Sequence, residues 1–176
     1  WVGGGGARGP GFVIDSAGGR HEVQGVGDGR FAIAMGVPRL DPRQVPLAGF
    51  SVAQPEYALE LDGQAIVFGA VSMGNPHAVI EVADVEQADV AGIGARLQRS
   101  PAFPQSCNVG FAQVLAPDRL RLRVYERGAG ETLACGTGAC AAVVAGIGLG
   151  LLDGRVDVHT RGGLLSIAWA GGVQDP

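Results

Sequence analysis

The sequence predicts an α+β fold in which a mostly antiparallel sheet wraps around one buried helix. Short segments with strand-like alternation recur along the 176 residues and are separated by Gly or Asp-Gly turns, which is the pattern of antiparallel strands. Residues 141–152 are apolar on every side, so a helix there belongs in the interior. Hydrophobic residues make up 47% of the chain and charged residues 17%, a composition typical of a well-buried globular protein.

About ten strands are expected, and most of them follow one another as antiparallel neighbours. The clearest covers residues 119–126, where Leu120, Leu122 and Val124 alternate with arginines and predict one buried face and one face in water. The remaining strands are expected at residues 12–15, 20–26, 30–35, 57–61, 65–73, 78–82, 108–115, 155–160 and 164–170.

Two helices are expected between these strands. The first runs from Asp84, its predicted N-cap, to about Gln98, although Gly92 and Gly94 weaken it. The second is the apolar segment 141–152, which follows a turn of small residues. Loops are expected at the Gly-rich residues 3–10 and at the closing turn 171–176.

Cys135 lies in the turn that leads into the second helix. A helix N-terminus presents unpaired N–H groups and the positive end of the helix dipole, which stabilise a thiolate or hold a carboxylate. Cys135 is therefore a candidate reactive thiol with a lowered pKa. A single cysteine near a helix start is also compatible with a small buried hydrophobe, and the local pattern alone leaves both interpretations open.

Composition excludes several classes of protein. All thirteen basic residues are Arg, so the chain has no Lys for a pyridoxal phosphate Schiff base or for a Walker A loop. The net charge is −4 without a basic run, which argues against nucleic acid and anionic membrane as partners. The three His and three Cys lack metal-ligand spacing, and the odd Cys count favours a reducing compartment.

A partial dinucleotide-binding pattern accompanies the same turn. Gly136, Gly138 and Ala141 approximate the glycine fingerprint, and Asp157 follows about twenty residues later. Nine residues separate Glu126 from Gly136, which is too many for the tight strand-to-helix turn that a pyrophosphate site needs. A dinucleotide-binding module is therefore a distant alternative.

Three motifs in order resemble the diaminopimelate epimerase family: Ser-Met-Gly-Asn-Pro-His at 72–77, Asn-Val-Gly-Phe at 108–111, and the run at 123–142 that contains Glu126 and Cys135. The similarity covers nearly the whole chain from about Phe12. It implies the C-terminal half of a pseudo-symmetric two-domain epimerase fold. Residues 1–48 would be a remnant of the N-terminal domain with a crossover linker, and residues 49–176 the C-terminal domain.

The resemblance implies a cofactor-independent isomerase that interconverts LL- and meso-diaminopimelate, for lysine and peptidoglycan precursors in the bacterial cytoplasm. One cysteine thiolate removes the α-proton and a second thiol returns a proton on the opposite face. Cys135 would be one of the two catalytic cysteines. A homodimer is expected by resemblance, with no metal and no cofactor.

The remaining site residues take roles by the same resemblance. His77 and Glu126 would modulate the pKa values of the thiols. The substrate-binding residues would be Asn75, Asn108, Glu126, Arg127, Gly136 and Thr137. Within this set, backbone N–H groups of Gly136 and Thr137 would hold the α-carboxylate, and Arg127 would grip the distal carboxylate. Cys107 and Cys140 are expected to be ordinary buried cysteines.

The sequence departs from the family pattern at both ends. The family's first catalytic cysteine, in a Cys-Gly-Asn-Gly turn, would precede Trp1, and the family's closing strand would follow Pro176. The chain is therefore expected to be truncated, to carry half a site and to be inactive by itself. The alternatives are a relative of the proline-type racemases and a non-catalytic amino-acid-binding domain.

Overall fold

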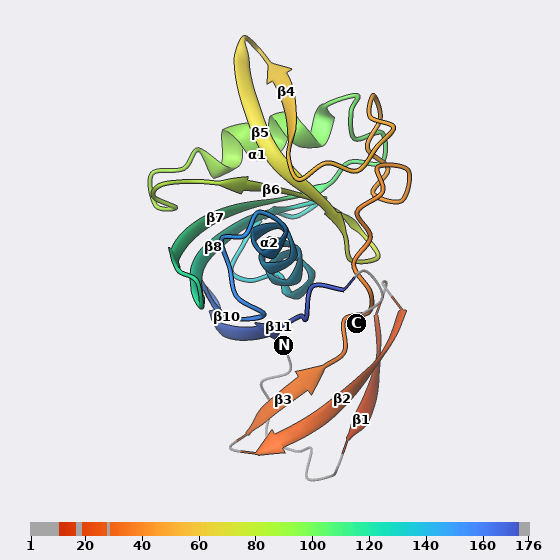
Figure 1. Ribbon diagram of the computed structural model, residues 1–176, viewed down its shortest axis with the longest axis vertical. Helices are drawn as coiled ribbons and strands as arrows, with labels where there is room; N and C mark the ends of the chain where they lie inside the picture. The colour runs from red at the N-terminus through yellow and green to blue at the C-terminus, as the bar shows by residue number, and fades with distance from the viewer. Residues whose placement is uncertain (1–10, 17–18, 28, 173–176) are drawn as a thin grey trace.

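The computed structural model describes residues 11–16, 19–27 and 29–172, in which it contains eleven strands and two helices (Figure 1). The loop expected at residues 3–10, and residues 173–176 of the expected closing turn, lie outside the described part. The α+β class is confirmed, because a large and mostly antiparallel sheet surrounds a buried helix.

Eight strands form the large sheet, in the order β11-β10-β8-β7-β6-β5-β4, with β9 paired to β8 off this path. Neighbours are antiparallel except for the parallel pairs β6–β7 and β8–β10. The strands are β4 (Tyr57–Leu61), β5 (Gln64–Ser72), β6 (Pro76–Glu81), β7 (Asn108–Ala116), β8 (Arg119–Glu126), β9 (Gly130–Thr132), β10 (Arg155–Thr160) and β11 (Gly163–Ala168).

Helix α2 (Gly136–Gly148) lies inside the curve of this sheet, which bends around it (Figure 1). Its small residues let strands approach from several sides, and eight of its thirteen residues are buried. The core around it includes Leu120, Leu122 and Val124 of β8. The predicted buried face of this strand is therefore confirmed.

The bounds expected for this helix, 141–152, were wrong at both ends. The helix begins at Gly136, because the small residues that precede Ala141 continue the helical turn. It ends at Gly148, and the N–H groups of Gly150 and Leu151 close it by bonding to Ile147 O and Gly146 O. Gly150 adopts a φ of 71°, the left-handed conformation of such a C-terminal motif.

Helix α1 (Val90–Arg99) covers the other face of the sheet, against β7, β8 and β9. Its N-cap is Asp89, whose Oδ1 accepts a hydrogen bond from Gly92 N at 2.9 Å. The predicted N-cap, Asp84, is wrong: it accepts from Glu86 N in a preceding turn. Gly94 lies against the Tyr125 ring, and an added Cβ would come within 2.6 Å of it. The two glycines that lower helix propensity therefore have structural roles: Gly92 bonds the N-cap side chain, and Gly94 leaves room for the Tyr125 ring.

A separate three-stranded antiparallel sheet contains β1 (Phe12–Ser16), β2 (Gly19–Gly27) and β3 (Arg30–Ile33). It lies below β11 and the large sheet in the view of Figure 1. The segment that follows crosses to the large sheet, where Arg39 bridges to Ser72. Val45 and Leu47, farther along this segment, are buried in the outer core with α1.

The ten expected strands are all present, with ends shifted by two residues at most. The sequence did not predict β9, because its three residues carry no hydrophobic alternation. This strand also changes the expected wet face of β8. Arg119 and Arg121 are exposed, whereas the Arg123 side chain is only 11% exposed because Glu131 of β9 pairs with it.

Candidate active site

Cys135 is the N-cap residue of α2, with extended backbone angles (φ −135°, ψ 114°) that turn the chain from β9 into the helix. Its carbonyl accepts the first helical hydrogen bond, from Ala139 N at 2.9 Å. Gly138 permits this arrangement, because an added Cβ would lie 3.3 Å from the Cys135 sulfur. The thiol is therefore packed against the first turn of the helix, as the sequence predicted, and the residue is 7% exposed.

A chain of polar side chains leads from the thiol to a buried histidine. The Cys135 Sγ lies 3.4 Å from Thr137 Oγ1. Asn75 Nδ2 donates to Thr137 Oγ1 at 3.4 Å, and Asn75 Oδ1 lies 3.0 Å from His77 Nε2. Asn75 precedes β6 and His77 is the second residue of this strand, so the fold joins two motifs that are about sixty residues apart in sequence.

Glu126 approaches the thiol from the end of β8. Its carboxylate accepts a short hydrogen bond from the Thr132 hydroxyl, across the hairpin that connects β8 to β9. The negative charge of Glu126 acts on Cys135 and opposes loss of the thiol proton. The sequence predicted Glu126 but not Thr132, whose position six residues farther along the same motif was the only available signal.

Burial raises the pKa of the Cys135 thiol above its ordinary value, and Glu126 adds to this effect. Hydrogen bonds from the Thr137 side chain and the Gly138 backbone lower the pKa but do not reverse the balance. The expectation that the helix N-terminus would depress this pKa below normal is therefore wrong for the structure described here, because desolvation is the largest influence.

His77 is 1% exposed and remains neutral near neutral pH. Burial, with a smaller effect from the positive charge of Arg127, lowers the pKa of His77 to about 4. Because Asn75 Oδ1 can only accept, the imidazole donates to it from Nε2. The structure thus places His77 two side chains away from the thiol.

Asn108 and Arg127 occupy the neighbouring ends of β7 and β8. Asn108 is buried and joins two backbone groups: its Nδ2 donates to Pro76 O at 3.3 Å, and its Oδ1 accepts from Arg127 N at 2.9 Å. The guanidinium of Arg127 donates to Gln105 O at 2.9 Å and has no carboxylate partner in the described part of the chain. Arg127 is exposed and available to an anion, whereas Asn108 mainly organises the loop.

The N–H groups of Gly136 and Thr137 precede the first intrahelical bond of α2. They point along the helix axis beside the thiol, as groups that bind an anion at a helix N-terminus do. The other two cysteines are buried, and burial raises the pKa of Cys107 to about 12 and that of Cys140 to about 11. Such thiols stay protonated and pack as small hydrophobes.

An ion-pair cluster holds β9 in place beside the site. Glu131 binds Arg123 through two hydrogen bonds of 2.7 and 2.9 Å and Arg161 at 2.8 Å. Arg123 also donates to Val85 O at 2.9 Å. The cluster fixes the hairpin that carries Thr132.

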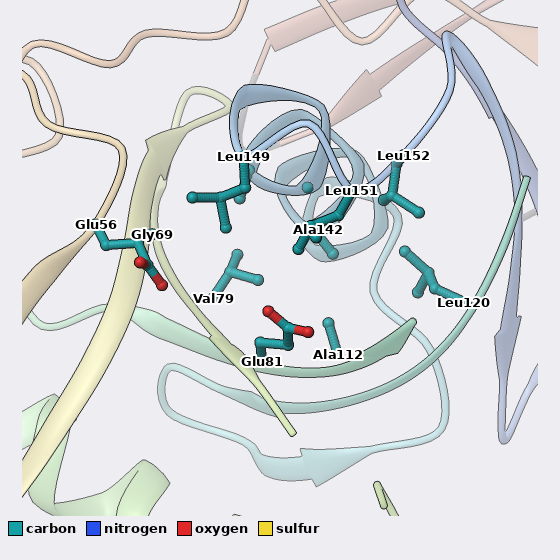
Figure 2. A pocket seen from close by; sticks show the side chains of 12 residues that line it. Glu56, Gly69, Val79, Glu81, Ala112, Leu120, Ala142, Leu149, Leu151 and Leu152 are labelled. Atoms are coloured by element: carbon teal, nitrogen blue, oxygen red, sulfur yellow. The ribbon is translucent and has the colours of Figure 1, made fainter. Parts of the chain in front are cut away.

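Two cavities lie away from the thiol. A cavity of about 20 Å³ near the C-terminal end of α2 is lined by apolar side chains with Glu56 and Glu81 among them (Figure 2). A second, of about 120 Å³, lies between β3, α2 and β11 and includes Cys140 and Trp169 in its lining. Cys135 lines neither of them. Within the described residues no set of three His, Cys, Asp or Glu is placed to hold a metal ion, and no helix has the length and hydropathy to cross a membrane.

The fold is shared with amino-acid racemases and epimerases of known structure. A probable proline racemase from Agrobacterium radiobacter superposes with a TM-score of 0.59 at 15% identity, over 94% of this chain and 55% of that one. A hydroxyproline epimerase from Agrobacterium vitis gives a TM-score of 0.55 at 17% identity, over 92% and 53%. These similarities establish the class of fold.

Sequence comparison identifies the family within that class. The family model for diaminopimelate epimerase matches residues 69–174. The diaminopimelate epimerase of Xanthomonas campestris is 55% identical over 165 residues, which are 94% of this chain and 58% of that protein. That of Acidovorax ebreus is 57% identical over 159 residues, covering 85% and 54%. The chain belongs to the diaminopimelate epimerase family and spans less than three fifths of these relatives.

Proposed function

We propose that this chain supplies one catalytic thiol of a diaminopimelate epimerase, an isomerase that interconverts LL- and meso-2,6-diaminopimelate without a cofactor. The observation that supports this proposal most directly is the position of Cys135, at the start of α2, between the side chains of Thr137 and Glu126. The high identity to diaminopimelate epimerases, against 15–17% to the proline-type enzymes, favours this substrate over proline.

In the proposed reaction, Cys135 exchanges one proton with the substrate α-carbon. As a thiolate it takes the α-proton and becomes a thiol, while a second thiol donates its proton to the opposite face of the carbanion and becomes a thiolate. The C–H bond that breaks is thus replaced by a new C–H bond of inverted configuration. In the reverse direction the two sulfurs exchange roles.

The second thiol would come from a part of the enzyme outside this chain. Cys107 and Cys140 are unsuited to the role, because the reverse reaction needs the second sulfur as a thiolate and burial raises the pKa of these two thiols to about 12 and about 11. We assign residues 1–48 to the end of an N-terminal domain with its linker and residues 49–176 to the C-terminal domain, whose edge would complete the site against its counterpart.

Substrate binding is proposed to follow the positive groups around Cys135. The N–H groups of Gly136 and Thr137 would hold the α-carboxylate, and the exposed Arg127 would bind the distal carboxylate in a bidentate manner. Asn75 and Asn108 would form hydrogen bonds with polar groups of the substrate. Each side-chain amide has two hydrogens and two lone pairs, and its present partners do not use all of them. Glu126 would accept from an ammonium group and tune the thiol.

We also propose that the protein acts as a homodimer in the bacterial cytoplasm, in the synthesis of lysine and of peptidoglycan precursors. Family membership supports this assignment. A small-molecule substrate follows from the same family membership, and the net charge of −4 argues against nucleic acid or an anionic membrane as a partner.

Deuterium exchange at the α-carbon tests the proposed function. The chain, its Cys135→Ala variant and a matched Cys107→Ala variant are incubated with LL- and meso-diaminopimelate in heavy water. We expect deuterium to enter without inversion, because only one of the two proposed catalytic thiols is present, and we expect the exchange to be lost only in Cys135→Ala. Full inversion by this chain, or exchange that survives in Cys135→Ala, would contradict the proposal. Ligand-induced stabilisation without exchange would instead support a binding-only domain.

A further inference from the structure

The Thr137 hydroxyl stands between Cys135 and Asn75, at 3.4 Å from the sulfur on one side and 3.4 Å from the amide nitrogen on the other. A hydroxyl has one hydrogen to donate and lone pairs to accept with. Its single hydrogen therefore points to only one of these neighbours at a time. The direction it takes is coupled to the protonation state of Cys135.

The positions of these side chains fit an arrangement in which every hydrogen bond points toward the sulfur. His77 Nε2–H donates to Asn75 Oδ1, and Asn75 Nδ2–H donates to Thr137 Oγ1. Since the hydroxyl already accepts from Asn75, its hydrogen is left for Cys135 Sγ. A thiolate can only accept, so this direction suits the deprotonated form.

The reverse direction suits the protonated form. A Cys135 thiol would donate to Thr137 Oγ1, and the hydroxyl would then donate to Asn75. A half-turn of the Asn75 amide presents its oxygen to Thr137 and its nitrogen to His77, whose Nε2 becomes the acceptor once its proton is on Nδ1. Among the residues that the structure describes, the amide bonds only Thr137 and His77, so the half-turn breaks no other side-chain hydrogen bond there.

We propose that Thr137, Asn75 and His77 form a reversible hydrogen-bond relay that matches both protonation states of Cys135. Thr137 is the positioning residue that contacts the sulfur, and neutral His77 supplies the two tautomers that the two directions need. The inference rests on the proposed acid–base role of Cys135, because a residue that takes and returns a proton needs support in both states. It gives the Thr137 side chain a role separate from its backbone N–H.

Other ionisable groups around the thiol remain outside the relay. Glu126 faces Cys135 from β8, and Cys140 lies behind it on α2. Arg127 acts on His77 through its charge. None of the three forms a hydrogen bond with Thr137 or Asn75 in the described part of the chain, but Glu126 shares a hydrogen bond with Cys135 and therefore competes with Thr137 for the thiol hydrogen.

The first test measures the pKa of Cys135 from the pH dependence of its alkylation by iodoacetamide, with the modified cysteine located by mass spectrometry. Thr137→Val keeps the shape of the side chain and removes the hydroxyl. We expect it to raise the pKa of Cys135 by about one unit, the size of a hydrogen bond to a charged group. Thr137→Ser, the matched control, should stay close to the parent. An unchanged pKa in Thr137→Val would overturn the proposal.

The second test asks whether Asn75 acts through Thr137. We expect Asn75→Ala to raise the pKa of Cys135 by less than Thr137→Val does, and to add nothing in a Thr137→Val background. A full additive shift in the double variant would show that Asn75 acts independently, against the relay. A general loosening of the site would also shift the pKa in both backgrounds, so the cycle separates positioning from packing.

The third test follows His77 in the unmodified chain. The ring-nitrogen chemical shifts of His77, measured by NMR with ¹⁵N labelling, distinguish the Nε2–H tautomer from the Nδ1–H tautomer. We expect Nε2–H when Cys135 is a thiolate and Nδ1–H when it is a thiol, with the change at the pKa of Cys135. A tautomer that stays constant through this titration would overturn the reversal. None of these measurements uses diaminopimelate, so failure of the relay leaves the exchange experiment to decide the function.

Discussion

Cys135 shows how opposing influences on one residue combine. Burial and the Glu126 carboxylate raise the pKa of this thiol, whereas the bonds from Thr137 and Gly138 lower it. A helix N-terminus alone therefore does not determine whether a cysteine is ionised. The outcome depends on how much water the surrounding side chains exclude.

The effect of Glu126 can be isolated by a neutral substitution. Glu126→Gln removes the negative charge while retaining the size of the side chain, so the pKa of Cys135 should fall. Alkylation of Cys135 would then begin at lower pH. Glu60→Gln, which removes an exposed carboxylate on β4, is the matched control. A pKa of Cys135 that rises or stays constant in Glu126→Gln would show that the carboxylate does not act on the thiol.

Several residues of the candidate site were named from motifs that resemble those of diaminopimelate epimerases, and only Cys135 was also indicated by its place before the buried helix. The structure brings them together: Glu126 acts directly on Cys135, and Asn75 links the Thr137 side chain beside Cys135 to His77. The partners of Asn108 could not be predicted, since they are backbone groups that come close only when β6, β7 and β8 pair.

At the scale of elements, the glycines of α2 differ in whether the surrounding structure leaves room for a side chain. Gly146→Ala would bring a Cβ within 2.4 Å of the buried Leu152 side chain, and we expect it to lower the free energy of unfolding by about 1–3 kcal/mol. Gly148→Ala meets no atom within 4 Å and should be neutral or stabilising by up to about 1 kcal/mol. Chemical denaturation of both variants tests the pair. Equal effects would contradict this account of the helix packing.

The ion-pair cluster offers a second test at this scale. Glu131→Gln removes the charge that pairs with the nearly buried Arg123, and we expect a loss of about 1–2 kcal/mol in the free energy of unfolding. Asp62→Asn is the control, because Asp62 is 79% exposed and lies 3.8 Å from Arg96, so its loss should cost only a few tenths of a kcal/mol. Thermal and urea unfolding would measure the difference. A Glu131→Gln variant as stable as the parent would show that the cluster adds no stability.

Strand positions were predictable wherever alternation or Gly-rich turns marked them. Helix ends were less so, because propensity does not reveal which small residues a neighbouring strand will cover. The helix start, expected at Ala141, is an example. Gly136 and Gly138 disfavour a helix by themselves, yet the helix begins at Gly136, where the sheet encloses it and the Cys135 thiol packs against Gly138.

At the scale of the whole molecule, buried His77 couples stability to pH. In the unfolded chain this residue takes up a proton near pH 6.5, whereas the folded protein does so only near pH 4. The unfolded state therefore binds more protons between these values, so the free energy of unfolding should fall as pH drops, by about 3 kcal/mol in all.

Unfolding measured between pH 7 and pH 4 in the parent and in His77→Gln tests this expectation. The variant should lose most of the slope between pH 6.5 and pH 4.5. The contribution of Glu131, whose pKa Arg123 lowers, is present above the ordinary carboxyl pKa of 4.5 and is lost only below it. If the pH dependence of the free energy of unfolding is unchanged in His77→Gln, a group other than His77 causes it.

The enclosure of α2 by the sheet also has a kinetic consequence. Four of the thirteen residues of this helix are Gly, and none is charged, so the isolated segment has little reason to be helical in water. Its contacts come from strands as far away in sequence as β5 and β11. The helix should therefore form late, after slow pairing of distant segments, and nascent chains would hold Cys135 without its hydrogen-bonding partners until the last steps of folding.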